Sequence, residues 1–195
     1  MPREAPLMDI LCEKYRELRL DGSLIGLERA DGPAYFCTPV GAEVIGWDSG
    51  IHYCFIRGLG DTVFCVNPET CCEHYVYPIA RSFRDFLGLI LAVGNTNTLQ
   101  QIILWDKEAY KAFVNSPHER DNLRKSEVRS ALDALRRGTG VEPIGSPFEY
   151  VKALQSDFPY EKIPFSDEYY EVLGLERPGA AAPGRRSAPA DLTGD

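Results

Sequence analysis

Two short segments, IHYCFIR (residues 51–57) and TVFCVN (62–67), are apolar on both alternating sides of an extended chain. Because successive side chains of a strand point to opposite sides of a sheet, a strand of this kind must be covered on both sides. The two sides of the first segment are Ile51, Tyr53 and Phe55, and His52, Cys54 and Ile56. Both segments are therefore predicted to be central strands, with other elements packed on each face.

Turn signals around these segments predict an antiparallel meander. The tetrapeptide GLGD (58–61) predicts a tight hairpin loop between the two central strands. AEVIGW (42–47) reads as a strand before them, and HYVY (74–77) as a strand after them. LIGLER (24–29) is a candidate for a further short strand. The sequence thus predicts three to five antiparallel strands.

Helical periodicity marks most of the remaining chain. The strongest helix is expected over residues 81–95, where Ser82 is an N-cap residue and Asp85 follows three positions later. Asp106 is expected to cap a helix over 106–114. The other predicted helices cover residues 7–20, 98–105, 118–137 (closed by Gly138), 148–158 and 166–175.

These elements predict the α+β class, with a small, mostly antiparallel sheet wrapped by helices and extra helices at the C-terminal end. Residues 1–175 are expected to form one globular domain, since this length can bury a real core. Residues 176–195 consist largely of Pro, Gly, Ala and Arg, without the large apolar side chains that a core needs. This tail is predicted to be disordered.

The charge is acidic and unevenly spread. The 195 residues contain 21 Lys and Arg against 29 Asp and Glu, for a net charge of −8. Residues 140–175 hold 2 basic and 7 acidic side chains, whereas residues 115–139 hold 6 and 4. An acidic surface repels phosphate backbones and attracts basic proteins, so we expect a protein partner and no nucleic acid. The alternative is that the charge serves only solubility.

Nothing in the sequence predicts a membrane segment or a secretion signal. The longest apolar run, FLGLILAV (86–93), is less than half of the roughly 18–20 residues that a membrane helix needs. The N-terminus has charges around a short apolar patch and lacks the apolar region of a signal peptide. We therefore expect no membrane interaction and a cytoplasmic location.

The segment CVNPETCCEHYVYP (65–78) places three cysteines and a histidine within ten positions. A structural zinc site needs four ligands, usually arranged as two close pairs. Cys71, Cys72 and His74 could supply only part of such a set, and the paired spacing CxxC does not occur in the chain. We interpret the segment as lining of the sheet, and we predict no metal and no cofactor.

A cysteine nucleophile needs a histidine within hydrogen-bonding reach. His52 and Cys54 are the candidates on one strand, but residues two apart on a strand are separated by about 7 Å. His118 lies in NSPHERD, which reads as the start of a helix. We therefore predict no catalytic residues and a protein that is not an enzyme.

Several linked features over about residues 38–114 are similar to the SUKH superfamily, which groups bacterial immunity domains and fungal cell-wall regulators. These features are Gly46-Trp47 at a strand end, the paired apolar strands, Asn67-Pro68, Pro78-Ile79-Ala80, Ser82-Phe83, Phe86-Leu87 and Trp105-Asp106. The chain resembles a divergent member, with LMDILCEKYRELRL in place of the usual front end.

The resemblance implies a SUKH-like fold without catalytic residues, in a protein that binds and neutralises a cognate toxin such as a basic nuclease. The candidate partner-binding residues are Glu69, Glu73, Tyr75 and Tyr77. Carboxylates would meet a basic nuclease, and tyrosines supply contact area at low entropic cost. The alternative for the tyrosines is that both simply pack on the edge of the sheet.

Two other functions stay open. A regulatory or scaffold protein of the same fold would use the acidic helices of residues 140–175 to bind a partner that is not a toxin. A cysteine- or zinc-dependent hydrolase would instead use the thiols and imidazoles described above.

Overall fold

The two apolar segments form the centre of one antiparallel sheet in the computed structural model, which describes residues 10–29, 32–70 and 73–178. Its strands follow one another in the order β1-β2-β3-β4, so the predicted meander is confirmed. The strands are β1 (Ala42–Asp48), β2 (Ile51–Ile56), β3 (Val63–Val66) and β4 (Val76–Ala80). The fold is of the predicted α+β class.

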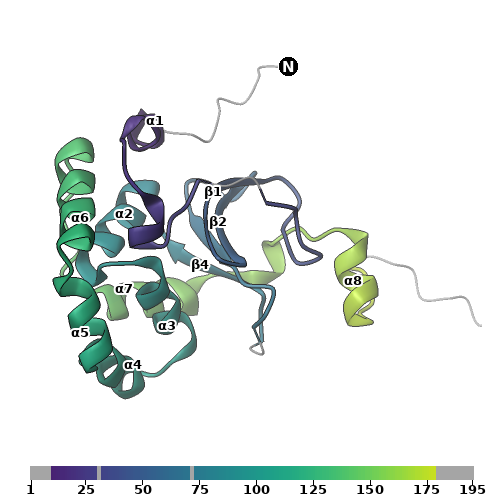
Figure 1. The fold of residues 1–195 in the computed structure, drawn as a ribbon. Helices are drawn as coiled ribbons and strands as arrows, with labels where there is room; N and C mark the ends of the chain where they lie inside the picture. Colours follow the sequence, from purple (N-terminus) through teal and green to yellow (C-terminus); the bar gives the residue numbers. More distant parts are fainter. Residues whose placement is uncertain (1–9, 30–31, 71–72, 179–195) are drawn as a thin grey trace, which may run out of the picture.

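Helices make up about half of the structure. The described residues contain eight α-helices and two short 3-10 helices, η1 (Gly22–Ile25) and η2 (Tyr160–Lys162). The α-helices are α1 (Ile10–Glu17), α2 (Phe83–Val93), α3 (Thr96–Leu104), α4 (Lys107–Val114), α5 (Pro117–Arg124), α6 (Ser126–Thr139), α7 (Pro147–Asp157) and α8 (Asp167–Leu173). Helices α2 to α7 gather on one side of the sheet, and α8 lies beyond its other side (Figure 1).

The helical side of the sheet carries the main core. Tyr53 and Phe55 of β2 and Cys65 of β3 point into it and are buried. Phe83 and Phe86 of α2 pack against them, with the rings of Tyr53 and Phe86 centred 5.0 Å apart. Buried residues of α1, α3, α6 and α7 complete the same cluster, so these helices belong to the core.

The opposite side of the sheet is also covered, as the apolar pattern predicts. Cys54 of β2 and Phe64 of β3 are fully buried there. Their cover is the loop that contains Cys37 and the segment after α7, where Phe158 lies edge-on to Phe64 with ring centres 5.3 Å apart. Ile163 closes this second cluster.

Gly46, a position on which the family resemblance depends, has a steric reason to be glycine. The backbone of Glu28 pairs with β1 here as a single antiparallel bridge and exchanges two hydrogen bonds with Trp47, of 2.7 and 2.8 Å. A Cβ atom on Gly46 would lie 2.7 Å from the side chain of Leu27, closer than carbon atoms pack. A glycine at position 46 leaves room for Leu27 and for this bridge.

Local capping chemistry was predictable. The Ser82 hydroxyl accepts the Asp85 N–H at the start of α2, and Asp106 accepts the N–H groups of Glu108 and Ala109 at the start of α4. Both caps are confirmed as predicted, because N-cap side chains satisfy backbone groups that lack helical partners.

Three predicted elements were wrong in type or extent. Residues 24–29 form η1 and the single bridge at Glu28 instead of a strand, because Asp21 caps a helical turn by accepting the Ser23 N–H. The predicted helix 118–137 is two helices that meet at Lys125, and the C-cap of α6 is Gly140, two residues beyond the predicted Gly138. The fourth strand starts at Val76 instead of residue 74.

If both faces of the sheet are true core, truncation on either face will be equally costly. We predict that Phe64→Ala and Phe86→Ala will each lower the free energy of unfolding by about 3–5 kcal/mol in urea denaturation. Val172→Ala, at a position that is 58% exposed, is the control and should change it by less than about 0.5 kcal/mol. A loss below 1 kcal/mol for Phe64→Ala would contradict the second core.

Candidate functional site

The structure describes an open polar cavity of about 380 Å³. It lies between η1, the end of β1 and the N-terminal ends of α3, α5 and α6. The polar side chains that line it include Asp48, Asn95, His118, Glu119, Lys125 and Glu127. We call this hollow the polar cavity.

Asp48, at the end of β1, forms one wall together with α3. Its Oδ2 atom lies 2.8 Å from the Thr96 hydroxyl and accepts a 3.0 Å hydrogen bond from the Gln100 amide. The same amide donates to the buried Tyr53 hydroxyl at 2.8 Å, which ties the cavity to the core. Burial raises the pKa of Asp48 above its usual value, and the nearby charge of Glu28 raises it further.

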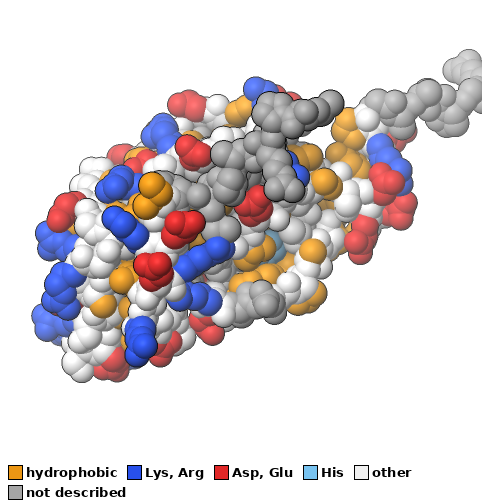
Figure 2. Space-filling view, turned by 90° about the horizontal axis from the view of Figure 1, so that it is seen from above, with side chains coloured by type: hydrophobic (Ala, Val, Ile, Leu, Met, Phe, Trp, Pro, Cys, Tyr) orange, Lys and Arg blue, Asp and Glu red, His pale blue; other side chains and the backbone are white. Residues whose placement is uncertain are grey.

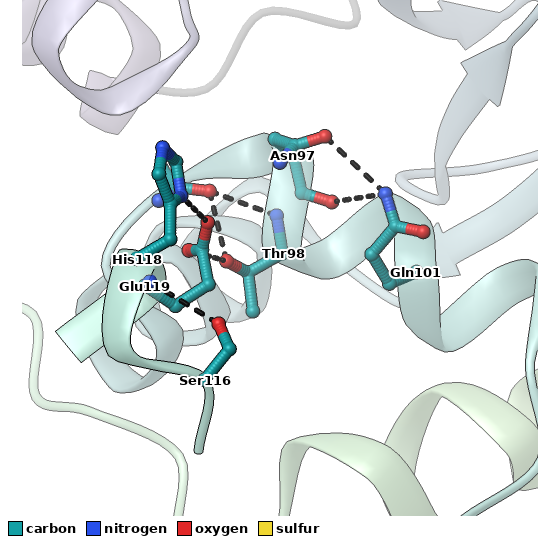
Figure 3. Close-up of polar contacts among 7 residues, drawn as sticks. Asn97, Thr98, Gln101, Ser116, His118 and Glu119 are labelled. Carbon is teal, nitrogen blue, oxygen red and sulfur yellow. Dashed lines mark hydrogen bonds and ion pairs between the residues drawn. The ribbon is translucent and has the colours of Figure 1, made fainter. Parts of the chain in front are cut away.

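A second part of the lining is built around Glu119 of α5, which is 5% exposed. Its two carboxylate oxygens lie 3.2 Å from His118 Nδ1 and 3.4 Å from the Thr98 hydroxyl (Figure 3). Thr98 is held in turn by Asn95, whose Oδ1 accepts the Thr98 N–H at 2.8 Å. Residues from two helices thus fix the position of this carboxylate.

Carboxylates dominate the charge of the cavity. Asp48, Glu119 and Glu127 face a single lysine, Lys125, and an exposed histidine, His118. Carboxylates in the first turns of helices are favourable in their own right, because the partial positive charge of a helix N-terminus attracts them. The arrangement can hold a polar ligand with cationic N–H groups.

The four predicted partner-binding residues do not form one surface. Glu69 and Glu73 are exposed in the connection between β3 and β4, while Tyr75 and Tyr77 are half-buried. The Tyr77 hydroxyl accepts the His74 N–H at 3.2 Å on the helical side of the sheet. Tyr75 packs on the opposite side, so the two tyrosines point to different layers.

Tyr75 belongs to a group of rings that connects the sheet to α8. Its ring lies edge-on to Phe36 at 5.1 Å and to Tyr169 of α8 at 6.3 Å. Tyr169 also stacks on Phe165 at 3.8 Å. We use the name C-terminal surface for the rings of Phe36, Tyr75, Phe165 and Tyr169 together with the exposed side chains of Val172 and Leu175.

The thiols on the sheet are enclosed by apolar neighbours. Burial raises the pKa of Cys54 to about 12, so its thiol is protonated at neutral pH. His52 contacts the Thr38 hydroxyl at 3.4 Å and lies against the ring of Trp47. The described residues contain no group of three or more His, Cys, Asp or Glu side chains able to hold a metal ion. Cys71 and Cys72 lie outside the described residues.

The sequence reasoning missed the polar cavity. Two of its lining residues, Asp48 and Glu119, are 71 positions apart in the sequence, so no local motif contains both of them. One signal was present, because Ser116 and Glu119 match the S-x-x-E pattern of a capping box. That pattern predicts the start of α5 but gives no sign that the glutamate lines a cavity.

No protein-family model, no curated protein and no solved structure matches this chain. The similarity to the SUKH superfamily therefore rests on the residues named in the sequence. Within the described residues no single helix has the length and apolar composition of a membrane span, although α2 and α3 together reach it as a pair bent by 98°.

His52 gives the protein a predictable response to acid. Burial lowers its pKa from 6.5 to about 4, so between these values the unfolded chain binds a proton that the folded chain does not. The contribution of His52 to stability is therefore fully present above pH 6.5 and falls as the pH drops towards 4, by about 3 kcal/mol.

The measurement is urea denaturation at pH 7 and pH 4.5 for the wild type and for His52→Gln, which keeps polar atoms but cannot titrate in this range. Asp48, with a raised pKa, acts in the opposite direction in both proteins, so the difference between the two pH responses reports His52 alone. Equal pH responses would show that His52 is accessible to protons in the folded state.

Proposed function

We propose that this protein is a non-catalytic binding domain of the immunity type, which neutralises a basic protein toxin by binding it through the C-terminal surface. The observation that carries the proposal is the exposure of apolar side chains on α8 and directly after it. Val172 of α8 and Leu175, two residues after its end, are 58% and 53% exposed. Exposed aliphatic side chains next to aromatic rings are suited to contact with a protein partner.

Helix α8 contacts the rest of the chain through few side chains, which leaves much of its surface available to a partner protein. None of its residues is fully buried, and it contacts the rest of the chain mainly through the ring of Tyr169. The exposed aliphatic groups are accompanied by Glu168 and by two acids paired with Arg177, namely Asp167 and Glu171. Aromatic and aliphatic groups inside a polar rim are the usual composition of a protein interface.

The distribution of charge favours a basic partner at this end. Most Lys and Arg side chains lie towards the end formed by α5 and α6, with acids between them, whereas the end that carries α8 shows several Asp and Glu and few Lys and Arg (Figure 2). Such a separation orients an approaching basic protein towards α8 and speeds the encounter.

The enclosed thiols support binding over catalysis. Cys54 is fully buried and its thiol is protonated at neutral pH, so it cannot act as a nucleophile from that position.

The second candidate function is a regulatory or scaffold protein. In that case the same exposed surface of α8 would bind a partner that is not a toxin.

The proposal can be tested with a photo-cross-linking amino acid at position 172, expressed in the native cells. We expect cross-linking to a small basic protein that is toxic when expressed alone and harmless when co-expressed with this chain. Val172→Asp should weaken the complex at least about tenfold and abolish the protection, because a carboxylate would be buried in the apolar part of the interface.

Ile10→Asp is the matched control. Ile10 is an exposed aliphatic residue of α1, a helix that packs on the opposite side of the sheet from α8. This variant should bind and protect like the wild type, with circular dichroism confirming that both variants fold. A captured partner that is not toxic would favour the regulatory function, and equal effects of the two variants would refute the assignment to the C-terminal surface.

A further inference from the structure

We propose that the polar cavity binds a small molecule that carries an ammonium or guanidinium group together with an oxygen acceptor, the chemistry of a basic amino acid. This site is separate from the C-terminal surface, so the inference goes beyond the proposed function and stands without it.

The first observation is that Glu119 is not used as a helix cap. In a capping box the glutamate at this position returns to the N–H of the N-cap residue. Here the Ser116 N–H donates to the Phe113 carbonyl, and the Glu119 carboxylate turns towards His118 and Thr98 instead (Figure 3). The carboxylate therefore lines the cavity without making the capping hydrogen bond.

The second observation is that this buried carboxylate lacks a strong cationic partner. A buried charge is costly unless it is paired and hydrogen-bonded. No lysine or arginine within the described residues forms an ion pair with Glu119, and its one ion-pairing partner, His118, has a side chain that is 90% exposed. An ammonium or guanidinium group in the cavity would supply the missing charge.

Asp48 provides a second acceptor in the lining of the cavity. Its contacts with Thr96 and Gln100 both involve Oδ2, and Oδ1 receives no hydrogen bond from any residue that the structure describes. The Thr96 hydroxyl has one proton and also lies 2.6 Å from the Gly26 carbonyl. Asp48 therefore has acceptor capacity left for an N–H group of a ligand.

The third observation concerns the oxygen acceptor of the ligand. Asn95 is 7% exposed and uses its Oδ1 to hold Thr98, but its amide nitrogen makes no hydrogen bond within the described part of the chain. This N–H donor borders the cavity and is available to an oxygen acceptor of a ligand. Lys125, on the rim, adds a positive charge that suits a carboxylate on the same ligand.

The volume of the polar cavity and the charges around it narrow the class of ligand that it can bind. About 380 Å³ is near the lower end of the range for small-molecule sites, which fits one compact ligand. The N-termini of α3, α5 and α6 by themselves would favour an anion, each with about half a positive charge. Glu119 and Glu127 occupy the first turns of α5 and α6, and with Asp48 they leave the cavity attractive to a cation.

Isothermal titration calorimetry of the full chain tests the proposal with L-arginine and L-lysine. Citrulline and norleucine are the matched probes, because they keep the size of the side chains but lack the cationic group. We expect saturable one-to-one binding of at least one basic amino acid, and binding at least about tenfold weaker for its neutral counterpart. Inorganic phosphate is the third probe. Binding of phosphate alone, equal binding of the neutral probes, or no binding at 10 mM would overturn the proposal.

Single substitutions in the lining test whether the ligand binds in the polar cavity. Glu119→Gln keeps the shape of the side chain and should weaken binding at least about tenfold. Glu127→Gln, at an exposed position, is a second variant with little risk to folding and should weaken it several-fold. The matched control is Glu108→Gln, because Glu108 also lies exposed in the first turn of a helix but is absent from the lining of the cavity. Equal losses in all three variants would show a general effect of charge and no site here.

Discussion

The structure depends on strands β2 and β3 being buried on both faces. Because neither face can be left in water, the chain has to supply two covers for one small sheet. The helices α2, α3, α6 and α7 provide the first, and the segment from Phe158 to Tyr169 provides the second. The second cover brings α8 to the far side of the sheet, and α8 and the residues directly after it carry the exposed aliphatic groups on which the proposed binding function rests.

Much of this arrangement could be predicted from the sequence because the deciding signals are local. Alternation of side chains placed Cys54 and Tyr53 on opposite faces, and capping chemistry located the starts of α2 and α4. The errors have physical causes that a local pattern does not contain. The break at Lys125 interrupts an apolar stripe that continues through two helices, and the segment after Asp21 turns helical because its carboxylate caps a short turn.

The polar cavity could not be predicted, because it is made by tertiary contacts alone. Asp48, Asn95 and Glu119 each have an ordinary local role, as a strand end, an N-cap and a residue in a first helical turn. Only the packing of α5 and α6 beside α3 brings their side chains around one hollow. The predicted partner residues show the same limit, since Tyr75 and Tyr77 alternate to different layers and only Tyr75 reaches the C-terminal surface.

Hydrogen exchange measured at increasing denaturant tests the central claim most directly. If both covers belong to one cooperative core, the amides of β2 and β3 will exchange only through global unfolding, at the same free energy as those of α2. The amides of α8, which buries no residue fully, will exchange at much lower free energy. Exchange of β2 and β3 through a local opening well below the global value would show that one face is not covered and would contradict the account.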